Sequence, residues 1–377
     1  MNKVIYLAHY DIPDRDTPRY RSAPACAKID YISKTIADLG YDIELLSASN
    51  TLGDGCSAEE ISVSPNFIIS FLKGFKRRKN KLSRICSTVL FNINLLFNCL
   101  KKVKKNDTLI VYHSLALMWL VKIVKLLKSP KLILEVEEIY ADVLNNAKTK
   151  KRELSYFKIA DSYLFCSDVL DGIVNTDKKP SAVIYGTYQV EEDRNVKRND
   201  GKIHLLYAGT FSKQKGVMTA INLASNLPSN YHIHILGKSS TNVLANINKI
   251  VSHNNKTNHA TVTYDGFLSG EDYIRFVQSC DIGLSPQNSN TTFNETSFPS
   301  KVLSYLSNGL RVVSVKLDPL EQSSISHLLY YYEGDSIEKL AETVQLISFL
   351  DPYDSRVIVD ELDEKFRKAM DCLLRSR

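Results

Sequence analysis

The sequence predicts an α/β protein made of two parallel-sheet domains. Short apolar runs of strand length alternate with segments of helical spacing, and this alternation occurs twice, on either side of a polar stretch at 190–202. The 377 residues also exceed what one ordinary hydrophobic core accommodates. We therefore expect two Rossmann-like domains facing a central cleft, where such sheets bind ligands at the carboxyl ends of their strands.

The first domain is predicted to span 1–190. Its strands are apolar runs too short to be helices, at Val4–Ala8, Ile43–Ser47, Leu109–His113, Leu132–Val136 and Ser162–Cys166. Helical spacing is found at Ala23–Leu39, which ends at Gly40, after the Leu109 strand as far as Leu127, and at Leu154–Ala160.

The second domain is predicted to span 200–350 by the same pattern. Its strands are expected at His204–Ala208, His232–Leu236, Thr261–Tyr264, Ile282–Ser285 and Arg311–Val315. Its helices are expected at Val217–Ser225, Glu271–Cys280, Lys301–Ser307 and Ile337–Phe349. A last helix at Ser355–Leu374 belongs to a segment, 351–377, that we expect to return to the first domain.

Charge is distributed unevenly along the chain. The formal net charge is +6, but residues 61–106 hold eleven Lys and Arg and no acidic residue, so the remainder carries 6 − 11 = −5. Within this region, 72–105 places basic clusters on both sides of the apolar run Ile85–Leu100. That run is interrupted by asparagines and is shorter than eighteen residues, so no membrane-spanning helix is predicted. We expect instead a segment that lies on an anionic membrane surface; a helix covering the core with a solvated basic face is the alternative.

The cysteine pattern and the N-terminal sequence indicate the cellular compartment in which the protein is expected. Seven cysteines are scattered without a CxxC pair, which favours a reducing compartment over a disulfide framework. The chain starts directly with a strand-like run and shows no signal-peptide pattern. No zinc-ligand spacing is recognised, and neither a metal nor another cofactor is expected.

Three blocks of the second half resemble a known enzyme family. They read YAGTFSKQKGVMTAI, VTYDGFLSGEDYIRFVQSCDIGLSP and TSFPSKVLSYLSNGLRVVSV, and cover about 110 residues in the expected order. They resemble the retaining nucleotide-sugar glycosyltransferases of family 4, which have the two-domain GT-B fold, and within that family the members that build bacterial surface polysaccharides such as O-antigen or capsule. The resemblance implies a hexosyltransferase that uses a nucleotide sugar and needs no metal.

The first block implies the groups that bind the donor diphosphate. Gly209 and Thr210 would let the backbone approach the phosphates, and Lys215 matches the lysine that the family uses there, with Lys213 as a second cation. Cations and amide hydrogens stabilise the negative charge that the leaving nucleotide develops. The alternative is that both lysines are solvated loop charges.

The third block implies a helix entry that holds the donor. Ser297, Phe298, Pro299, Ser300 and Lys301 fit the first turn of a helix whose N–H groups bind phosphate; an ordinary helix cap is the alternative. Family members carry two glutamates with seven residues between them. Here the second position is Ser304, and the first falls near Glu295 or Thr296, so carboxylate recognition of the ribose is not expected to follow the family pattern.

The first half contributes weaker candidates. By resemblance, His113 at a strand end is the candidate near the transferred sugar, and Glu137 and Glu138 at the next strand end would contact the sugar or the acceptor. Core packing of the histidine and an ordinary acidic loop are the alternatives. Arg19 and Arg21, in the loop after the first strand, would bind an acceptor phosphate, since guanidinium binds phosphate through two hydrogen bonds; ordinary surface arginines are the alternative.

The resemblance and the basic segment together predict a function. We expect a retaining transfer of a sugar, for which galactose carried on UDP is the first guess, to a lipid-linked polysaccharide acceptor. The protein would be cytoplasmic and peripheral on the inner face of the cytoplasmic membrane. Two alternatives stay open: a catalytically inactive assembly partner of the same fold, suggested by Ser304, or a nucleic-acid-binding protein that uses the basic segment. The lack of any nucleic-acid-binding motif argues against the second.

Overall fold

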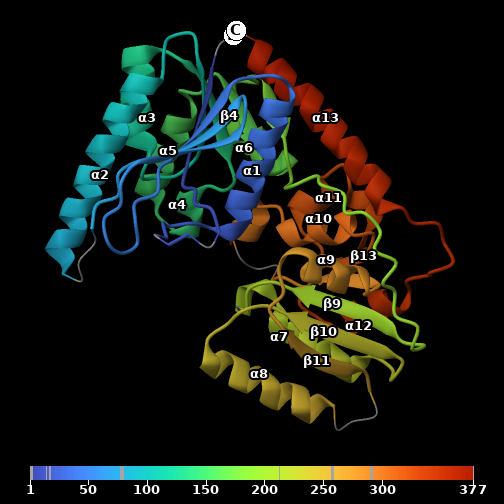
Figure 1. The fold of residues 1–377 in the computed structure, drawn as a ribbon. Coiled ribbons are helices and arrows are strands. Elements are labelled where there is room, and N and C mark those ends of the chain that lie inside the picture. Colours follow the sequence, from blue (N-terminus) through green and yellow to red (C-terminus); the bar gives the residue numbers. More distant parts are fainter. Residues whose placement is uncertain are drawn as a thin grey trace. The chain divides into compact units, whose positions relative to one another are not determined.

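The structure is a computed structural model that describes residues 3–13, 15–16, 18–76, 80–211, 213–255, 259–288 and 292–376. It divides into two compact units, Met1–Thr187 with Lys365–Arg377, and Tyr188–Glu364. Each unit contains one predominantly parallel sheet with helices on its faces (Figure 1). The two-domain GT-B fold that the sequence predicts is thereby confirmed.

Unit 1 has an eight-stranded sheet in the order β3-β4-β2-β1-β5-β6-β7-β8. All neighbours are parallel except β3, which pairs antiparallel with β4 at the edge. The strands are β1 (Val4–Ala8), β2 (Ile43–Ser47), β3 (Glu59–Ser64), β4 (Phe67–Phe71), β5 (Thr108–Tyr112), β6 (Lys131–Val136), β7 (Ser162–Phe165) and β8 (Ser181–Val183).

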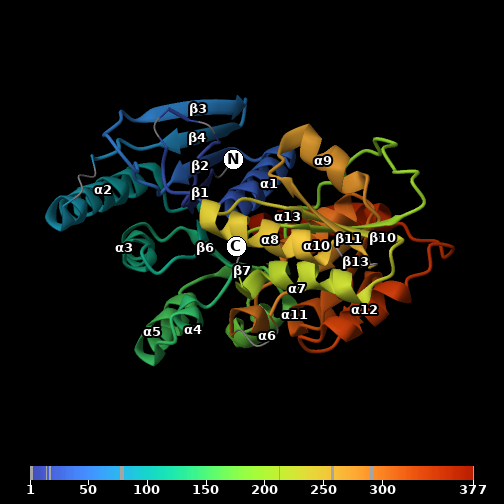
Figure 2. The same cartoon turned by 90° about the horizontal axis from the view of Figure 1, so that it is seen from below.

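Helices cover both faces of this sheet. They are α1 (Ala23–Asp38), α2 (Lys81–Lys102), α3 (Met118–Lys128), α4 (Tyr140–Val143), α5 (Ala147–Phe157) and α6 (Asp168–Val174). α2 and α3 lie beside each other on one face, and α1 lies on the other (Figures 1 and 2). The core on the α2 face is formed by apolar side chains of β1, β5 and β6.

Unit 2 has a six-stranded parallel sheet in the order β11-β10-β9-β12-β13-β14. Its strands are β9 (Ile203–Ala208), β10 (Tyr231–Leu236), β11 (Thr261–Gly266), β12 (Ile282–Ser285), β13 (Arg311–Val315) and β14 (Leu329–Tyr332). Parallel strands are buried on both faces, which is why most of them read as continuous apolar runs.

The helices of unit 2 lie on both sides of the sheet, with α9 and α10 on one side and α7 and α8 on the other (Figure 1). In chain order they are η1 (Lys213–Lys215), α7 (Val217–Asn222), η2 (Leu223–Asn226), α8 (Thr241–Asn254), α9 (Gly270–Gln278), η3 (Thr292–Glu295), α10 (Ser300–Ser307), α11 (Asp318–Glu321), η4 (Ser326–Leu328), α12 (Ile337–Gln345) and α13 (Ser355–Arg375).

Unit 2 is larger than the predicted domain 200–350, because the polar segment at 190–202 is not a free linker. The Arg194 guanidinium forms an ion pair with Glu271, its Nε atom 2.8 Å from Oε1. The Glu191 amide donates to the Ser307 carbonyl over 3.0 Å. The start of α13 also packs here, where the Ser355 hydroxyl donates to the Leu306 carbonyl over 2.8 Å.

The rest of α13 belongs to unit 1, which accounts for the inclusion of Lys365–Arg377. Phe366 stacks on Tyr31 of α1, with ring centroids 5.8 Å apart. The Tyr41 hydroxyl donates to the Asp371 carboxylate over 2.8 Å. The C-terminal helix therefore contributes residues to both units.

α2 differs from the sequence expectation for its length. It is 22 residues long, and by length and composition alone it is long and apolar enough to cross a membrane. No such helix is predicted from the sequence, because its apolar run is shorter than eighteen residues and is interrupted by asparagines. One face, with Phe91, Leu95 and Cys99, is packed in the core of unit 1. Its other apolar side chains are largely exposed.

Candidate functional site

Three neighbouring strands of unit 2 end in glycine at the same edge of the sheet. Gly209 follows β9, Gly237 follows β10, and Gly266 ends β11. The Gly209 amide donates to the Leu236 carbonyl over 3.0 Å, and the Gly237 amide donates to the Gly266 carbonyl over 2.8 Å. Gly209 and Thr210 are exposed. This edge therefore offers open backbone to which a ligand can come close.

The turn that leads into α7 requires glycine at one position. Gly216 has φ +81°, and a Cβ atom there would lie 1.7 Å from the Pro286 carbonyl oxygen. The loop after β12 thus packs directly against the start of α7. Because Gly216 is held in this way, the backbone position of Lys215 is fixed relative to the sheet.

Lys301 and Lys215 are brought together although 86 residues separate them. Lys301 is the second residue of α10, and its Nζ atom lies 3.5 Å from the Lys215 carbonyl oxygen. The same ammonium lies 4.1 Å from the centroid of the Tyr207 ring. A Cβ atom at Gly209 would be only 3.7 Å from it. The ends of β9 and the start of α10 therefore share one small volume.

The electrostatics of this volume favour an anionic ligand. Burial, and secondly the charge of Lys215, lower the pKa of Lys301 from its usual value near 10.5 to about 7. The ammonium groups of Lys301 and Lys215 repel each other, and an anion bound between or beside them would offset this repulsion. The site is therefore suited to a phosphate or diphosphate.

The remaining donor candidates lie around the start of α10. Glu295 ends η3 and is exposed, whereas Phe298 is 8 % exposed and Pro299 occupies the N-cap position. The N-cap residue of α10, Pro299, makes no side-chain hydrogen bond to the helix, so the ordinary N-cap given as the alternative for the start of this helix is not formed by that residue. The side chain of Lys213 lies outside the described residues.

Ser304 is engaged within the protein. Its Oγ atom lies 3.1 Å from the Tyr273 hydroxyl of α9. The expected carboxylate is therefore replaced by a hydroxyl pair, which can donate and accept hydrogen bonds but carries no charge. Tyr273 was not singled out in the sequence, because its role depends on the packing of α9 against α10.

In unit 1, Glu137 and Glu138 follow β6 at the carboxyl edge of the sheet, and both are half-buried. Glu137 forms an ion pair with Lys28 of α1, with Nζ and Oε1 2.5 Å apart. Lys28 also donates to the Ile184 carbonyl over 2.8 Å. Glu137 therefore has a fixed position and a balanced charge.

A buried acid beside these residues was missed. Glu135, fully buried in β6, accepts a short hydrogen bond from the Tyr6 hydroxyl, and desolvation followed by the charge of Glu137 raises its pKa to about 8. The signal was present, because a carboxylate inside an apolar strand is rarely buried without a partner. Glu135, Glu137 and Lys28 form one coupled group.

The structure corrects the prediction for His113. This side chain is 1 % exposed and its Nε2 atom lies 2.6 Å from the Glu153 carboxylate, which also accepts from the backbone amides of Tyr140 and Ala141. Aromatic rings surround it, with Phe157 at 4.8 Å between centroids. His113 is therefore a core residue out of reach of a substrate.

His9 is the more accessible histidine at this edge. It follows β1, is half-buried, and its Nε2 atom lies 3.4 Å from the Ser114 hydroxyl. Burial lowers its pKa, which keeps the imidazole neutral.

Arg19 is likewise corrected. It is 1 % exposed, and its guanidinium donates to the carbonyls of Ser49 and Leu72 over 2.8 and 2.6 Å. It therefore ties the loop after β1 to β2 and β4 and does not face an acceptor. Arg21 is exposed. Its exposure agrees both with a contact to an acceptor and with an ordinary surface arginine in contact with water.

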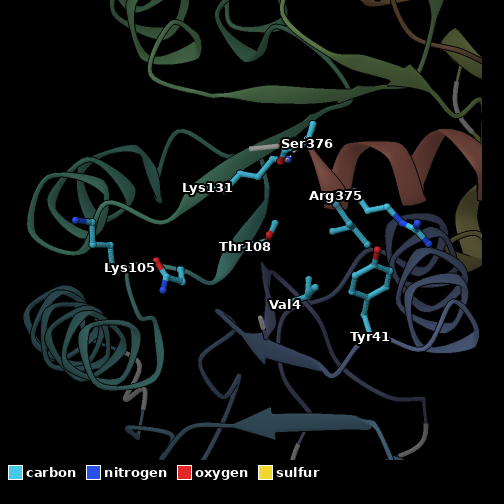
Figure 3. A pocket seen from close by; sticks show the side chains of 9 residues that line it. Val4, Tyr41, Lys105, Thr108, Lys131, Arg375 and Ser376 are labelled. Atoms are coloured by element: carbon cyan, nitrogen blue, oxygen red, sulfur yellow. Dashed lines mark hydrogen bonds between the residues drawn. The ribbon is translucent and has the colours of Figure 1, made fainter. Parts of the chain in front are cut away.

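A separate pocket of about 680 Å³ opens at the amino ends of β1, β5 and β6 (Figure 3). Its basic side chains are partly occupied by the chain itself, since Lys131 donates to the Ser376 hydroxyl over 2.7 Å and Arg375 pairs with Asp371. Ligands of such sheets bind at the opposite, carboxyl edge. We therefore do not place the substrate in this pocket.

Comparison with known proteins agrees with the geometry of unit 2. Residues 189–363 match the family model of the glycosyl transferases group 1, a range that lies within unit 2. No curated protein matches the sequence.

Solved structures resemble the whole chain. A trehalose-6-phosphate structure from E. coli, bound with UDP-2-fluoro glucose, has a TM-score of 0.70 at 9 % identity and covers 100 % of both chains. Sucrose-phosphate synthase from Thermosynechococcus elongatus has a TM-score of 0.66 at 13 % identity, covering 99 % of this chain and 95 % of its own. HepE from Anabaena, in complex with UDP, has a TM-score of 0.64 at 11 % identity, covering 98 % and 100 %. At such identities the likeness establishes the fold.

Proposed function

We propose that this protein is a glycosyltransferase that takes a sugar from a nucleotide diphosphate donor. The observation that carries the proposal is the convergence of Lys301, Lys215 and the open turn at Gly209. The match of residues 189–363 to glycosyl transferases group 1 supports it, as does the presence of UDP or a UDP sugar in structures of the same fold.

The chemistry follows from the two ammonium groups. The donor diphosphate leaves with negative charge, and Lys301 and Lys215 would stabilise that charge together with the backbone at Gly209 and Thr210. Positioning of the two substrates supplies the remainder of the rate acceleration, so no resident metal is required. We propose that the transfer retains the anomeric configuration.

Roles in the first unit are proposed from position. Glu137 and Glu138 lie at the carboxyl edge of the sheet, where ligands of this kind of sheet bind, and would orient the acceptor. Ser304 with Tyr273 would bind the ribose through hydroxyl groups.

Donor binding and transfer can be tested directly. A panel of nucleotide sugars, beginning with UDP-galactose, is screened for a rise in melting temperature of the full chain, because a ligand that binds only the folded state stabilises it. Stabilisation followed by release of UDP with an acceptor supports a transferase. Stabilisation without turnover with any acceptor would indicate an inactive relative, and no stabilisation by any nucleotide sugar contradicts the proposal.

The pKa of Lys301 predicts a pH dependence of donor affinity. Since Lys301 loses its proton near pH 7 in the free protein but must be charged to bind a diphosphate, affinity should be constant below pH 7 and fall up to about tenfold per pH unit above it. A nucleotide sugar carries a constant phosphate charge in this range, so the protein accounts for the change. Calorimetry in buffers of different ionisation enthalpy should show proton uptake, and Lys301→Arg should flatten the profile.

We further propose that the protein is peripheral on the cytoplasmic face of a membrane. The membrane surface, as we name it, consists of exposed apolar residues on α2 and α3: Leu82, Ile85, Val89, Leu90, Ile93, Phe97, Trp119, Leu126 and Leu127. Basic residues such as Lys81, Arg84 and Lys101 lie on the same helix, α2. Because the opposite face of α2 is packed in the core, the helix would lie along the bilayer surface.

This location accounts for the acceptor that we propose, a lipid-linked saccharide of a bacterial O-antigen or capsule. The apolar residues would enter the headgroup region while the lysines and arginines attract anionic lipid, each contributing about 1 kcal/mol.

Vesicle binding should depend on the exposed apolar face of α2. Leu90 and Phe97 are 51 % and 67 % exposed, and replacing both by glutamate removes apolar insertion and adds repulsion. We expect binding to phosphatidylglycerol vesicles to fall tenfold or more in sedimentation assays. Leu346→Glu, in unit 2 and 82 % exposed, is the matched control and should bind as the native protein does. Equal binding by the double variant and the control would contradict the membrane surface.

A further inference from the structure

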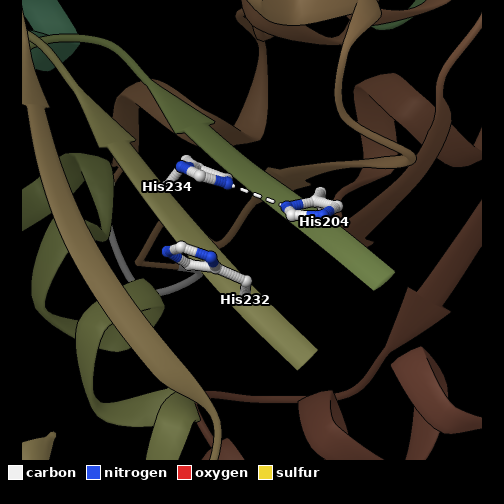
Figure 4. Close-up of side chains that lie close together, drawn as sticks. All are labelled: His204, His232 and His234. Carbon is white, nitrogen blue, oxygen red and sulfur yellow. Dashed lines mark hydrogen bonds between the residues drawn. The ribbon is translucent and has the colours of Figure 1, made fainter. Parts of the chain in front are cut away.

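Three histidines from two neighbouring strands converge in unit 2. His204 lies on β9, and His232 and His234 lie on β10, where the register places His232 beside His204 (Figure 4). Residues i and i+2 of a strand point to the same face, so all three imidazoles lie on one side of the sheet. One ring nitrogen from each histidine lies within 4.8 Å of one from each of the others.

The outward nitrogens of the two buried histidines are bonded to carboxylates. His204 is 1 % exposed and its Nε2 atom lies 3.0 Å from Asp200, and His234 is 2 % exposed and its Nδ1 atom lies 3.1 Å from Asp265. Carboxylates only accept hydrogen bonds, so these two nitrogens carry the protons.

The inward nitrogens then face each other as lone pairs. His204 Nδ1 and His234 Nε2 are 3.0 Å apart, and neither can donate to the other once the protons are on the outward atoms. Two lone pairs at this distance repel unless a cation lies between them. A proton shared between these two nitrogens would also relieve the repulsion but would not involve His232, the third histidine of the group.

The third histidine completes the arrangement. His232 is half-buried, its Nε2 atom lies 3.1 Å from the Thr263 hydroxyl, and that hydroxyl in turn donates to Asp265 over 2.9 Å. The Thr263 oxygen therefore accepts from His232, whose Nδ1 atom is left as the third lone pair.

We propose that His204, His232 and His234 bind a Zn²⁺ ion. Imidazole nitrogens suit zinc, and three histidines with an open fourth position make a recognised coordination set. Zn–N bonds of about 2.0–2.1 Å in a tetrahedron place the nitrogens about 3.4 Å apart. The His232 and His234 rings stack in this structure, with centroids 4.1 Å apart and planes at 25°, so both rings must turn out of the stack for their lone pairs to converge on one ion. The Asp200, Asp265 and Thr263 contacts are the outer hydrogen bonds that fix the tautomers of zinc-bound imidazoles. The half-exposed side of His232 leaves the fourth position to water.

This site is separate from the donor site. His204 and Gly209 are five residues apart along β9, about 16 Å. The ion would cross-link β9 and β10 and does not contact the diphosphate, so the inference is independent of the proposed function. The site could not be predicted from the sequence, because two of its histidines lie two residues apart on β10 and the third comes from β9, a pattern that lacks the spacing of a zinc motif.

Metal uptake by the full-length, untagged chain tests the proposal. After treatment with EDTA and desalting, titration with ZnCl₂ against a chromophoric chelator should give one tightly bound ion per chain, and Co²⁺ should give the visible absorption of a tetrahedral complex. His232→Gln should abolish both, whereas His327→Gln, an exposed histidine of the same unit, should change neither. Asp265→Ala should weaken zinc affinity by about 10- to 100-fold.

The outcomes are decisive in either direction. The proposal is overturned if the native chain takes up no stoichiometric zinc, or if His232→Gln binds it as His327→Gln does. Circular dichroism of the metal-free His232→Gln variant checks that it folds. If it does not fold, two other measurements decide: the zinc affinity of Asp265→Ala and the Co²⁺ spectrum of the native chain. The site is refuted if Asp265→Ala binds zinc as tightly as the native chain does, or if the native chain shows no tetrahedral Co²⁺ spectrum.

Discussion

Lys301→Met is expected to lower kcat/KM for glycosyl transfer by about two to three orders of magnitude, the usual effect of removing one group that stabilises a developing anion. Methionine keeps an unbranched apolar chain of similar length and removes the ammonium, which lies 4.1 Å from the Tyr207 ring centroid. Because the same ammonium contacts the diphosphate before and after transfer, UDP affinity should fall as well. Steady-state kinetics and calorimetry measure the two effects.

Lys215→Met should behave similarly, since its charge acts on the same volume. Lys339→Met is the control: this lysine is in unit 2 and 55 % exposed, and its charge is paired only loosely with Glu333. If Lys301→Met retains activity within twofold of the control, the assignment of the diphosphate site is wrong.

The second unit is the part that the sequence predicts best. Its central strands are buried on both faces by helices, so each is rich in apolar residues, with few polar interruptions, and is bounded by glycine or polar residues. β14 and α8 were missed, and both lie at the margins of the sheet. There, packing on one side only leaves a weaker apolar pattern.

The first unit shows what local patterns do not contain. β3 and β4 form an antiparallel hairpin at the sheet edge, and most residues of β3 are exposed, so its sequence carries little apolar signal. The turn at Pro65–Asn66 between them was a usable sign.

The residues of the candidate site also differ in how well the sequence predicts them. Lys215 and Lys301 could be proposed from the sequence because each belongs to a block with its own strand, turn and helix signals, and the structure brings the two blocks together. Arg19 and His113 were assigned from their place after a strand, but their burial depends on distant partners, the Ser49 and Leu72 carbonyls and the Glu153 carboxylate. Such long-range contacts have no local sequence signature.

Gly216→Ala is expected to destabilise unit 2 by about 3 kcal/mol or more. A positive φ alone costs a non-glycine residue about 1–2 kcal/mol. At Gly216 the new Cβ atom would in addition lie 1.7 Å from the Pro286 carbonyl oxygen, so the backbone must move. The movement displaces Lys215, and donor affinity should fall together with stability.

Gly266→Ala separates the two causes. Gly266 has φ +84°, nearly that of Gly216, but a Cβ atom there meets nothing within 4 Å. Its cost should therefore be the conformational term alone. Hydrogen exchange of peptides from β9 and β12 reports on unit 2 during urea unfolding, while the fluorescence of Trp119, the single tryptophan, reports on unit 1. Equal losses of protection in the two variants would show that the contact with Pro286 does not constrain the turn, and the fixed position of Lys215 would then need another cause.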